Sequence, residues 1–309
     1  MYGVLEGFAA IWLVILTGYI VGRMGLLGPH GREVLNMLTF SVASPALLFT
    51  TVAKADPYSV LGPQLAVAGL SACVVLALYW FGTRWWLRRD AGERTIGAMS
   101  ASTVNSANLG LPIATYVLGD PAWAAPVLLF QLAIFTPVNL SMMDAATQRA
   151  GKGITGVLKG IVTNPMIIGA LAGLVVSLLK WDVPTIIWTP LDVLAGASVP
   201  AMLLAFGISL VGSRPLQKDL GRRRDVWSAV GMKLLLHPVI AWLLATFVFG
   251  MDSQHVYIAV ILACLPTAQN IFVNASRYDS GVTIAKDTVL VTSVLGIPVM
   301  FLVAALLGG

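Results

Sequence analysis

The stretch that decides the fold lies between residues 103 and 112 and reads TVNSANLGLP. Apolar residues flank it on both sides, so it falls inside a segment long enough to cross a bilayer, which takes about 20 residues. Its polar side chains, Gly110 and Pro112 all disfavour a continuous helix. Because backbone that leaves the helix at membrane depth is tolerated only where it is buried in protein or lines a cavity, the stretch predicts a broken transmembrane helix.

A second stretch, LPTAQN at residues 265–270, matches the first with the order reversed. Pro266 comes four residues before Asn270, whereas Pro112 comes four residues after Asn108 and cannot donate to its carbonyl. If both helices unwind and cross, their half-helix N-termini and amide side chains would form a small polar pocket suited to a carboxylate. The predicted substrate site is Asn105, Asn108, Gly110, Gln269 and Asn270, with Pro112 and Pro266 as the helix breaks. Alternatively, the prolines are ordinary kinks and the amides join neighbouring helices.

The composition indicates an all-α integral membrane protein. Of the 309 residues, 58% are hydrophobic and 11% are charged, against about 25% charged in soluble domains. Apolar runs predict ten transmembrane helices at about 3–21, 33–53, 62–82, 95–118, 122–146, 164–181, 188–212, 226–249, 255–277 and 288–307. We read the first run as a retained helix because Glu6, and no basic residue, lies at its start.

Helices 1–5 and 6–10 resemble one another in outline. Helices 1 and 6 carry the pairs Gly18/Gly22 and Gly169/Gly173, and helices 2 and 7 carry Pro45 and Pro200. An odd number of spans in each half turns the second half upside down, as in many secondary transporters. The sequence therefore predicts two inverted five-helix repeats, 1–150 and 151–309. The glycine pairs and prolines are interpreted as packing features.

Basic residues predict the orientation. Lys and Arg gather in the odd-numbered loops, and the even-numbered loops hold only Lys54 and Lys180. This asymmetry places the odd loops in the cytoplasm and both termini outside it. The net charge of +5 is explained by these loops, so nucleic-acid binding is not expected.

Intramembrane charge is scarce. Asp144, Lys233 and Asp192 are placed near span ends, and Asp144 is a candidate for a coupling or gating role. The three histidines lack metal-ligand spacing, and no nucleophile has a recognisable base partner, so we expect no enzyme, cofactor or metal site.

Three motifs carry a resemblance to a known family: residues 105–112, residues 164–169 (NPMIIG) and residues 265–270. Over nearly its whole length the chain resembles a bacterial member of the auxin efflux carrier family, which includes plant PIN carriers and bacterial malate or malonate permeases. The resemblance implies a fold similar to bile-acid symporters and sodium/proton antiporters. Helices 1, 2, 6 and 7 would form a scaffold and dimer contact, and helices 3–5 and 8–10 a transport domain with broken helices 4 and 9 crossing at the substrate.

Carried over by position, Asn108, Pro112, Pro266 and Asn270 are the implied functional residues, with Asn105 and Gln269 next. The chain lacks the long hydrophilic loop of the plant carriers and the acidic ligands of sodium-coupled relatives. The leading hypothesis is an elevator-type carrier for a small organic anion such as an auxin-like compound or a dicarboxylate, and the resemblance implies a homodimer. Alternatives are a cation/proton antiporter on the same fold, which needs a buried ionisable group at the midplane, and a membrane sensor that transports nothing.

Overall fold

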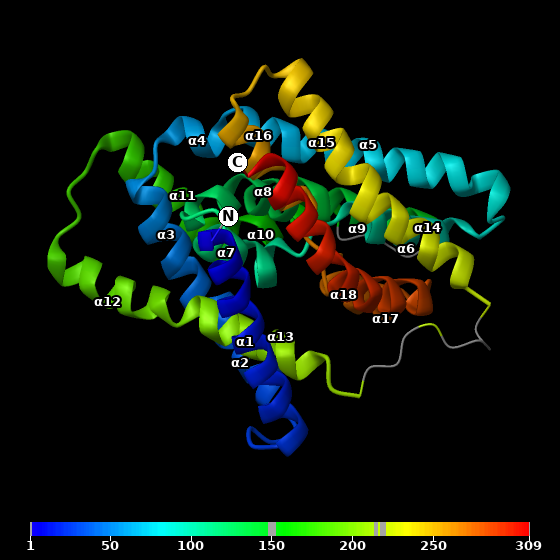
Figure 1. Ribbon diagram of the computed structural model, residues 1–309, viewed down its shortest axis with the longest axis horizontal. Coiled ribbons are helices and arrows are strands. Elements are labelled where there is room, and N and C mark those ends of the chain that lie inside the picture. Colours follow the sequence, from blue (N-terminus) through cyan, green and yellow to red (C-terminus); the bar gives the residue numbers. More distant parts are fainter. Residues whose placement is uncertain (1, 148–152, 213–215, 217–220, 309) are drawn as a thin grey trace. The chain divides into compact units, whose positions relative to one another are not determined.

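The computed structural model describes residues 2–147, 153–212, 216 and 221–308. All regular structure in this part of the chain is helical (Figure 1). Among the described residues, six helical stretches are long and apolar enough to cross a membrane: Gly31–Lys54, Pro63–Trp86, Pro121–Ala146, Thr185–Ser209, Arg223–Val248 and Val282–Leu307. They confirm six of the ten predicted spans. The predicted spans 3–21 and 164–181 are shorter apolar helices, Phe8–Met24 and Pro165–Leu179.

The chain divides into two compact units, each built from separated segments. The first unit comprises residues 1–62, 107–129 and 154–213, and the second comprises residues 63–106, 130–153 and 214–309. The helices of the first unit are α1 (Tyr2–Met24), α2 (Gly31–Leu38), α3 (Ser44–Lys54), α4 (Pro57–Leu61), α7 (Leu111–Tyr116), α10 (Gly153–Val162), α11 (Pro165–Leu179), α12 (Thr185–Gly196) and α13 (Ser198–Ser209). Helix α8 (Ala125–Phe130) ends at the boundary between the two units.

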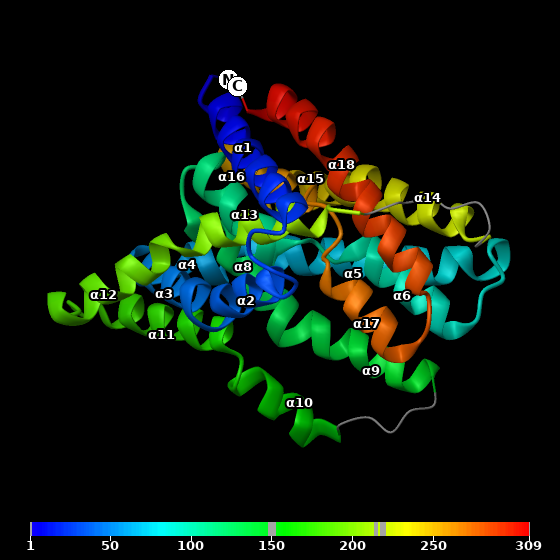
Figure 2. The same ribbon diagram turned by 90° about the horizontal axis from the view of Figure 1, so that it is seen from below.

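The helices of the second unit include the two longest of the chain. They are α5 (Pro63–Trp86), α6 (Ala91–Ser102), α9 (Thr136–Ala146), α14 (Arg223–Gly231), α15 (His237–Leu243), α16 (Ser253–Ala263), α17 (Asn270–Tyr278) and α18 (Val282–Leu307). Helix α6 packs on α5, α9, α14 and α18, and α17 packs along α18 (Figure 2). Helix α6 is therefore the centre of this unit.

Glycines bring two helix pairs of the first unit into backbone contact. A Cβ atom at Gly18 of α1 would lie 2.4 Å from the carbonyl oxygen of Leu204 in α13, and one at Gly169 of α11 would lie 2.4 Å from that of Pro45. Such contacts are the usual reason for small residues between membrane helices. The predicted close approach at the glycine pairs is confirmed, and its partners are α13 for α1 and α3 for α11.

Four prolines inside apolar stretches follow π-helical turns. The turns are Thr39–Ala43, Ser106–Gly110, Gln131–Phe135 and Met232–Leu236, and each ends two residues before Pro45, Pro112, Pro137 or Pro238. Proline lacks an N–H and its ring clashes with the carbonyl four residues back. A wider turn relieves that clash, as π-bulges do elsewhere, so the helix continues beyond the proline.

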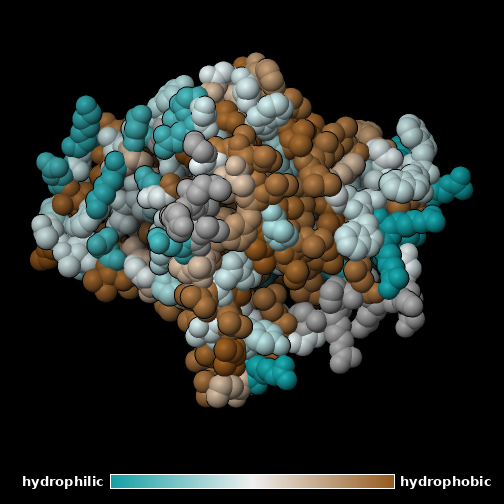
Figure 3. Space-filling view, in the orientation of Figure 1, coloured by the Kyte–Doolittle hydropathy of each residue, from teal (hydrophilic) through white to brown (hydrophobic). Residues whose placement is uncertain are grey.

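Large apolar side chains cover much of the surface. Leu13, Phe81, Phe247 and Val294 are each more than 60% exposed, and broad hydrophobic areas are visible on the face shown in Figure 3. A soluble protein rarely exposes apolar patches of this extent. The surface is that of a protein surrounded by acyl chains.

Candidate functional site

Both helices that were predicted to break are interrupted, and the two interruptions pair with each other in the second unit. Helix α6 ends at Ser102 and α16 ends at Ala263, and Val104 and Thr267 form an isolated antiparallel bridge beyond these ends. The N–H of Asn105 donates to the carbonyl of Pro266 at 2.8 Å, and the N–H of Ala268 donates to the carbonyl of Thr103 at 3.2 Å. The non-helical backbone of each helix thus supplies hydrogen-bond partners for the non-helical backbone of the other.

The side-chain amide of Gln131 forms hydrogen bonds with the backbone of Val104 on the side that faces away from Thr267. Its Oε1 accepts from the N–H of Val104 at 3.0 Å, and its Nε2 donates to the carbonyl of Val104 at 3.1 Å and to the hydroxyl of Ser106. Gln131 is not among the residues predicted from the sequence. Its signal was a lone amide within the apolar run APVLLFQLAIF of residues 125–135, where a polar side chain needs a partner.

Hydroxyl groups complete the bonding on the other side of the bridge. The N–H of Thr267 donates to Oγ1 of Thr292 in α18 at 3.0 Å, and the hydroxyl of Thr267 donates to the carbonyl of Ser100 at 2.6 Å. Thr267 and Thr292 are fully buried. Since each lost hydrogen bond in such surroundings costs about 1–3 kcal/mol, these contacts fix the position of the break.

The predicted site residues fall on both units. Asn105 is buried and its backbone bonds Pro266; Gln269 is half-buried; and Asn270 is exposed as the first residue of α17. The structure therefore brings Asn105 and the segment from Pro266 to Asn270 together. The extended residues of the first break are Thr103–Asn105, upstream of the position expected around Asn108.

The remaining predicted residues belong to the first unit. Asn108 is half-buried and Gly110 is buried within a π-helical turn, and Pro112 is buried in the first turn of α7. The missing N–H of Pro112 is accommodated by that turn.

Asp144 ties two helices of the second unit together. The hydroxyl of Tyr278, the last residue of α17, donates to Oδ1 of Asp144 in α9 at 2.7 Å. Asp144 is therefore connected to the half-helix that begins at Asn270. Asp192, by contrast, is exposed on α12.

Lys233 lies deep inside the second unit. Its side chain is 0% exposed, so it points into the protein and away from lipid and solvent. Its Nζ donates to the carbonyl of Ala263, the last residue of α16, at 2.9 Å, and lies 2.9 Å from Nδ1 of His237. A positive charge beside the C-terminal end of a helix is stabilised by the negative end of the helix dipole. Hydropathy alone could not show which face of its helix Lys233 occupies.

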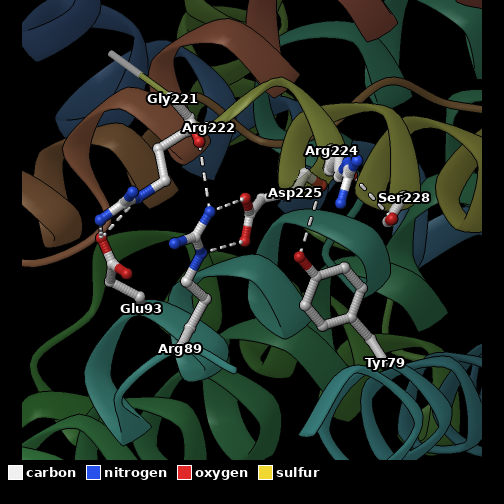
Figure 4. Close-up of polar contacts among 8 residues, drawn as sticks. All are labelled: Tyr79, Arg89, Glu93, Gly221, Arg222, Arg224, Asp225 and Ser228. Carbon is white, nitrogen blue, oxygen red and sulfur yellow. Dashed lines mark hydrogen bonds and ion pairs between the residues drawn. The ribbon is translucent and has the colours of Figure 1, made fainter. Parts of the chain in front are cut away.

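Ion pairs join the ends of α5, α6 and α14 (Figure 4). Both Arg89 nitrogens that contact Asp225 lie 3.0 Å from its carboxylate oxygens, and Arg222 contacts Glu93 at 2.9 Å. Asp225 is 1% exposed, and its hydrogen bond raises the pKa of the Arg89 guanidinium. A bidentate pair of this kind is geometrically specific and holds the three helix ends in register.

Within the described ranges, no group of three or more His, Cys, Asp or Glu residues could hold a metal ion. What this part of the chain does contain is a set of apolar spanning helices, two broken helices paired at their breaks, and a buried basic pair. This is the plan of a multi-pass membrane transporter.

Comparisons with known proteins establish the family. The family model described as "Membrane transport protein" matches residues 4–304, so the chain belongs to this family. Together with the relatives below, this match confirms the identification as a member of the auxin efflux carrier family. The chain is a transporter-family protein and not an enzyme.

The relatives differ in how much of their length is matched. The "Putative malonate transporter" of Rhizobium meliloti strain 1021 is 30% identical over 95% of this chain and 91% of its own length. The "Uncharacterized transporter YfdV" of Escherichia coli K12 is 23% identical over 93% of this chain and 91% of its own length. "Auxin efflux carrier component 1" of Arabidopsis thaliana is 26% identical over 49% of this chain and 25% of its own length.

Proposed function

We propose that the chain is a secondary transporter that moves a small organic anion, a mono- or dicarboxylate, across the membrane. The observation that carries the proposal is the bridge between Val104 and Thr267, which fixes two helix breaks against each other. Helix α17 begins directly after this bridge with the exposed Asn270. The N-terminus of a half-helix attracts an anion through its dipole and its backbone N–H groups.

The amides beside the break suit a carboxylate. Asn270, Gln269 and Asn105 can each donate a hydrogen bond without bringing a buried full charge. We assign the substrate to the start of α17, with these three side chains around it. Asn108 and Gly110 of the other unit stay candidates. The relative named for malonate supports a dicarboxylate, and the relative named for auxin supports a monocarboxylate.

The translocation step that we propose is of the elevator type. The division into two compact units supports it, because the unit with α5, α6, α9 and α14–α18 holds both breaks and can move as a body. The unit with α1–α4 and α10–α13 would be the scaffold and, in a homodimer, the contact between copies. The full proposal places ten spans as two inverted repeats in a bacterial inner membrane, with both termini outside the cytoplasm.

The test is exchange of labelled malonate in liposomes that contain the purified full-length chain, followed by a panel of mono- and dicarboxylates as competitors. Asn270→Ala should raise the malonate concentration that gives half-maximal exchange about tenfold or more, since a hydrogen bond to a charged group contributes about 1.5–3 kcal/mol. Gln254→Ala removes an exposed amide at the start of α16 and serves as the control. Exchange of no panel member above empty vesicles would overturn the proposal.

A further inference from the structure

A line of hydrogen-bonding groups crosses the interior of the second unit beside the break. His237 Nδ1 lies 2.9 Å from Lys233 Nζ, and His237 Nε2 lies 3.2 Å from the hydroxyl of Ser71 in α5. Lys233, His237 and Ser71 are 0%, 2% and 1% exposed. Lysine is almost never buried without a partner that balances its charge, so this site calls for an explanation.

Within the described residues, no carboxylate lies within 4.0 Å of Lys233 Nζ. Among the titratable groups on the elements packed around the pair, Cys264 faces Lys233. Cys73 on α5 is a free, exposed thiol, and Tyr257 on α16 has a buried hydroxyl without a hydrogen-bond partner. Three of the neighbouring groups form ion pairs: Asp225 of α14 with Arg89, Glu93 of α6 with Arg222, and His255 of α16 with Asp252. The carboxylate of Asp287 in α18 accepts from the N–H of Leu216 and lies 3.9 Å from Lys286. The hydroxyl of Tyr79 in α5 donates to the carbonyl of Asp225.

Two positive charges cannot coexist on neighbouring buried nitrogens 2.9 Å apart, because each disfavours the other and both are removed from water. The pair therefore carries at most one excess proton. When the proton is on Lys233, the ammonium donates to Nδ1 of His237 and to the carbonyl of Ala263. His237 then keeps its hydrogen on Nε2, which donates to Ser71.

The proton can move within the pair without any other rearrangement. Its transfer from Nζ to Nδ1 leaves a neutral amine that accepts from the imidazolium, and the total charge stays at one. Loss of the proton from either nitrogen leaves a neutral pair. This arrangement offers what a proton-binding site needs: a single exchangeable proton with a defined partner in each state.

We propose that Lys233 and His237 form a shared proton site that couples substrate movement to proton movement. The inference rests on the proposed function, since it assigns the driving ion of that transporter. The coupling runs through Ala263, whose carbonyl accepts from Lys233 and which ends α16 immediately before the break. A positive pair favours an anion at the break, and by linkage the bound anion favours the proton to the same extent. The consequence is symport of the anion with a proton.

The test uses the full-length chain in liposomes, with malonate as the probe and a pH-sensitive dye inside. Exchange of labelled for unlabelled malonate at equal pH measures translocation. Net uptake into malonate-free vesicles with an acidic exterior, recorded together with internal acidification, measures coupling. One proton carried with the malonate dianion moves one net negative charge, so the membrane potential is held at zero with equal potassium on both sides and valinomycin. Under this condition we expect the wild type to accumulate malonate about tenfold for each unit of pH difference.

Two variants separate the pair from general damage. His237→Gln keeps hydrogen-bonding groups but removes the imidazole, and Lys233→Arg fixes the charge because arginine is not deprotonated in proteins. Both should keep exchange at equal pH and lose the acid-driven accumulation and the dye response. His255→Gln, at an exposed histidine of the same unit, should keep both. Size-exclusion chromatography shows whether each variant is folded. If Lys233→Arg does not fold, the result for His237→Gln tests the proposal.

Three results would overturn the inference. Wild-type exchange without any proton movement would leave the proposed function standing and remove the coupling. Acid-driven accumulation that persists in folded His237→Gln or Lys233→Arg would show that the proton sits elsewhere. Absence of exchange in the wild type would instead overturn the proposed function itself, and the coupling with it.

Discussion

The side chain of Gln131 pairs with the backbone of Val104 as a neighbouring strand would, accepting its N–H at 3.0 Å and donating to its carbonyl at 3.1 Å. Val104 uses its other edge for the bridge to Thr267. The amide therefore takes the place of a third strand at a buried position, since Val104 and Gln131 are 5% and 6% exposed. Sheet edges do not occur against lipid for the same reason.

Gln131→Leu should damage the break more than the rest of the fold. The change leaves the buried N–H of Val104 without a partner, at a cost of about 1–3 kcal/mol. The carbonyl of Val104 loses one of two donors, because it also accepts from the N–H of Ser106 at 2.8 Å. We expect a lower melting temperature in detergent and loss of malonate exchange. Gln131→Asn, which shortens the same amide, should lose less stability than the leucine variant. Equal stability of Gln131→Leu and the wild type would contradict this role of the amide.

The close contact of α1 and α13 makes a second prediction. A Cβ atom at Gly207 would lie 2.1 Å from the carbonyl oxygen of Ile15, so Gly207→Ala must push the two helices apart. Overpacking costs about 1–3 kcal/mol, and thermal unfolding in detergent measures the loss of stability. Gly196→Ala at the end of α12 meets nothing within 4 Å and should be neutral. A small effect at Gly207 would mean that the helices pack less closely than described.

The breaks and the spans could be predicted because their signals are local. Proline, glycine and amides within an apolar run are visible in the sequence, and they predicted that these two helices break. The second break includes Pro266, but the first lies at Thr103–Asn105, and the helix continues through Pro112. The pairing of Val104 with Thr267 could not be predicted, since nothing in either segment specifies its distant partner. The burial of Lys233 and the role of Gln131 also depend on which side of a helix faces the interior. Hydropathy averages over all sides of a helix and so does not carry this information.

The ion pair between Arg89 and Asp225 predicts a third outcome. Asp225→Asn removes the charge that the guanidinium contacts with two nitrogens, and loss of one partner of a buried pair costs about 3 kcal/mol. The melting temperature should therefore fall, and added salt should change it little because a buried pair is weakly screened. Arg224→Gln, at an exposed position of the same helix, should stay within about 0.5 kcal/mol. A fall equal to that of Arg224→Gln would show that the pair contributes nothing measurable.

A gating role of Asp144 would act through its hydrogen bond with Tyr278. Helix α17 starts at the proposed substrate site and ends at this bond, so release of the bond frees the far end of the half-helix. We expect Asp144→Asn and Tyr278→Phe each to change the rate of malonate exchange severalfold, and the double variant to add little, because the two residues act through one contact. Asp192→Asn, at an exposed carboxylate of α12, is the control and should exchange normally. If the two variants lower only the melting temperature and leave the exchange rate per folded molecule unchanged, the bond is a structural tie and Asp144 does not gate.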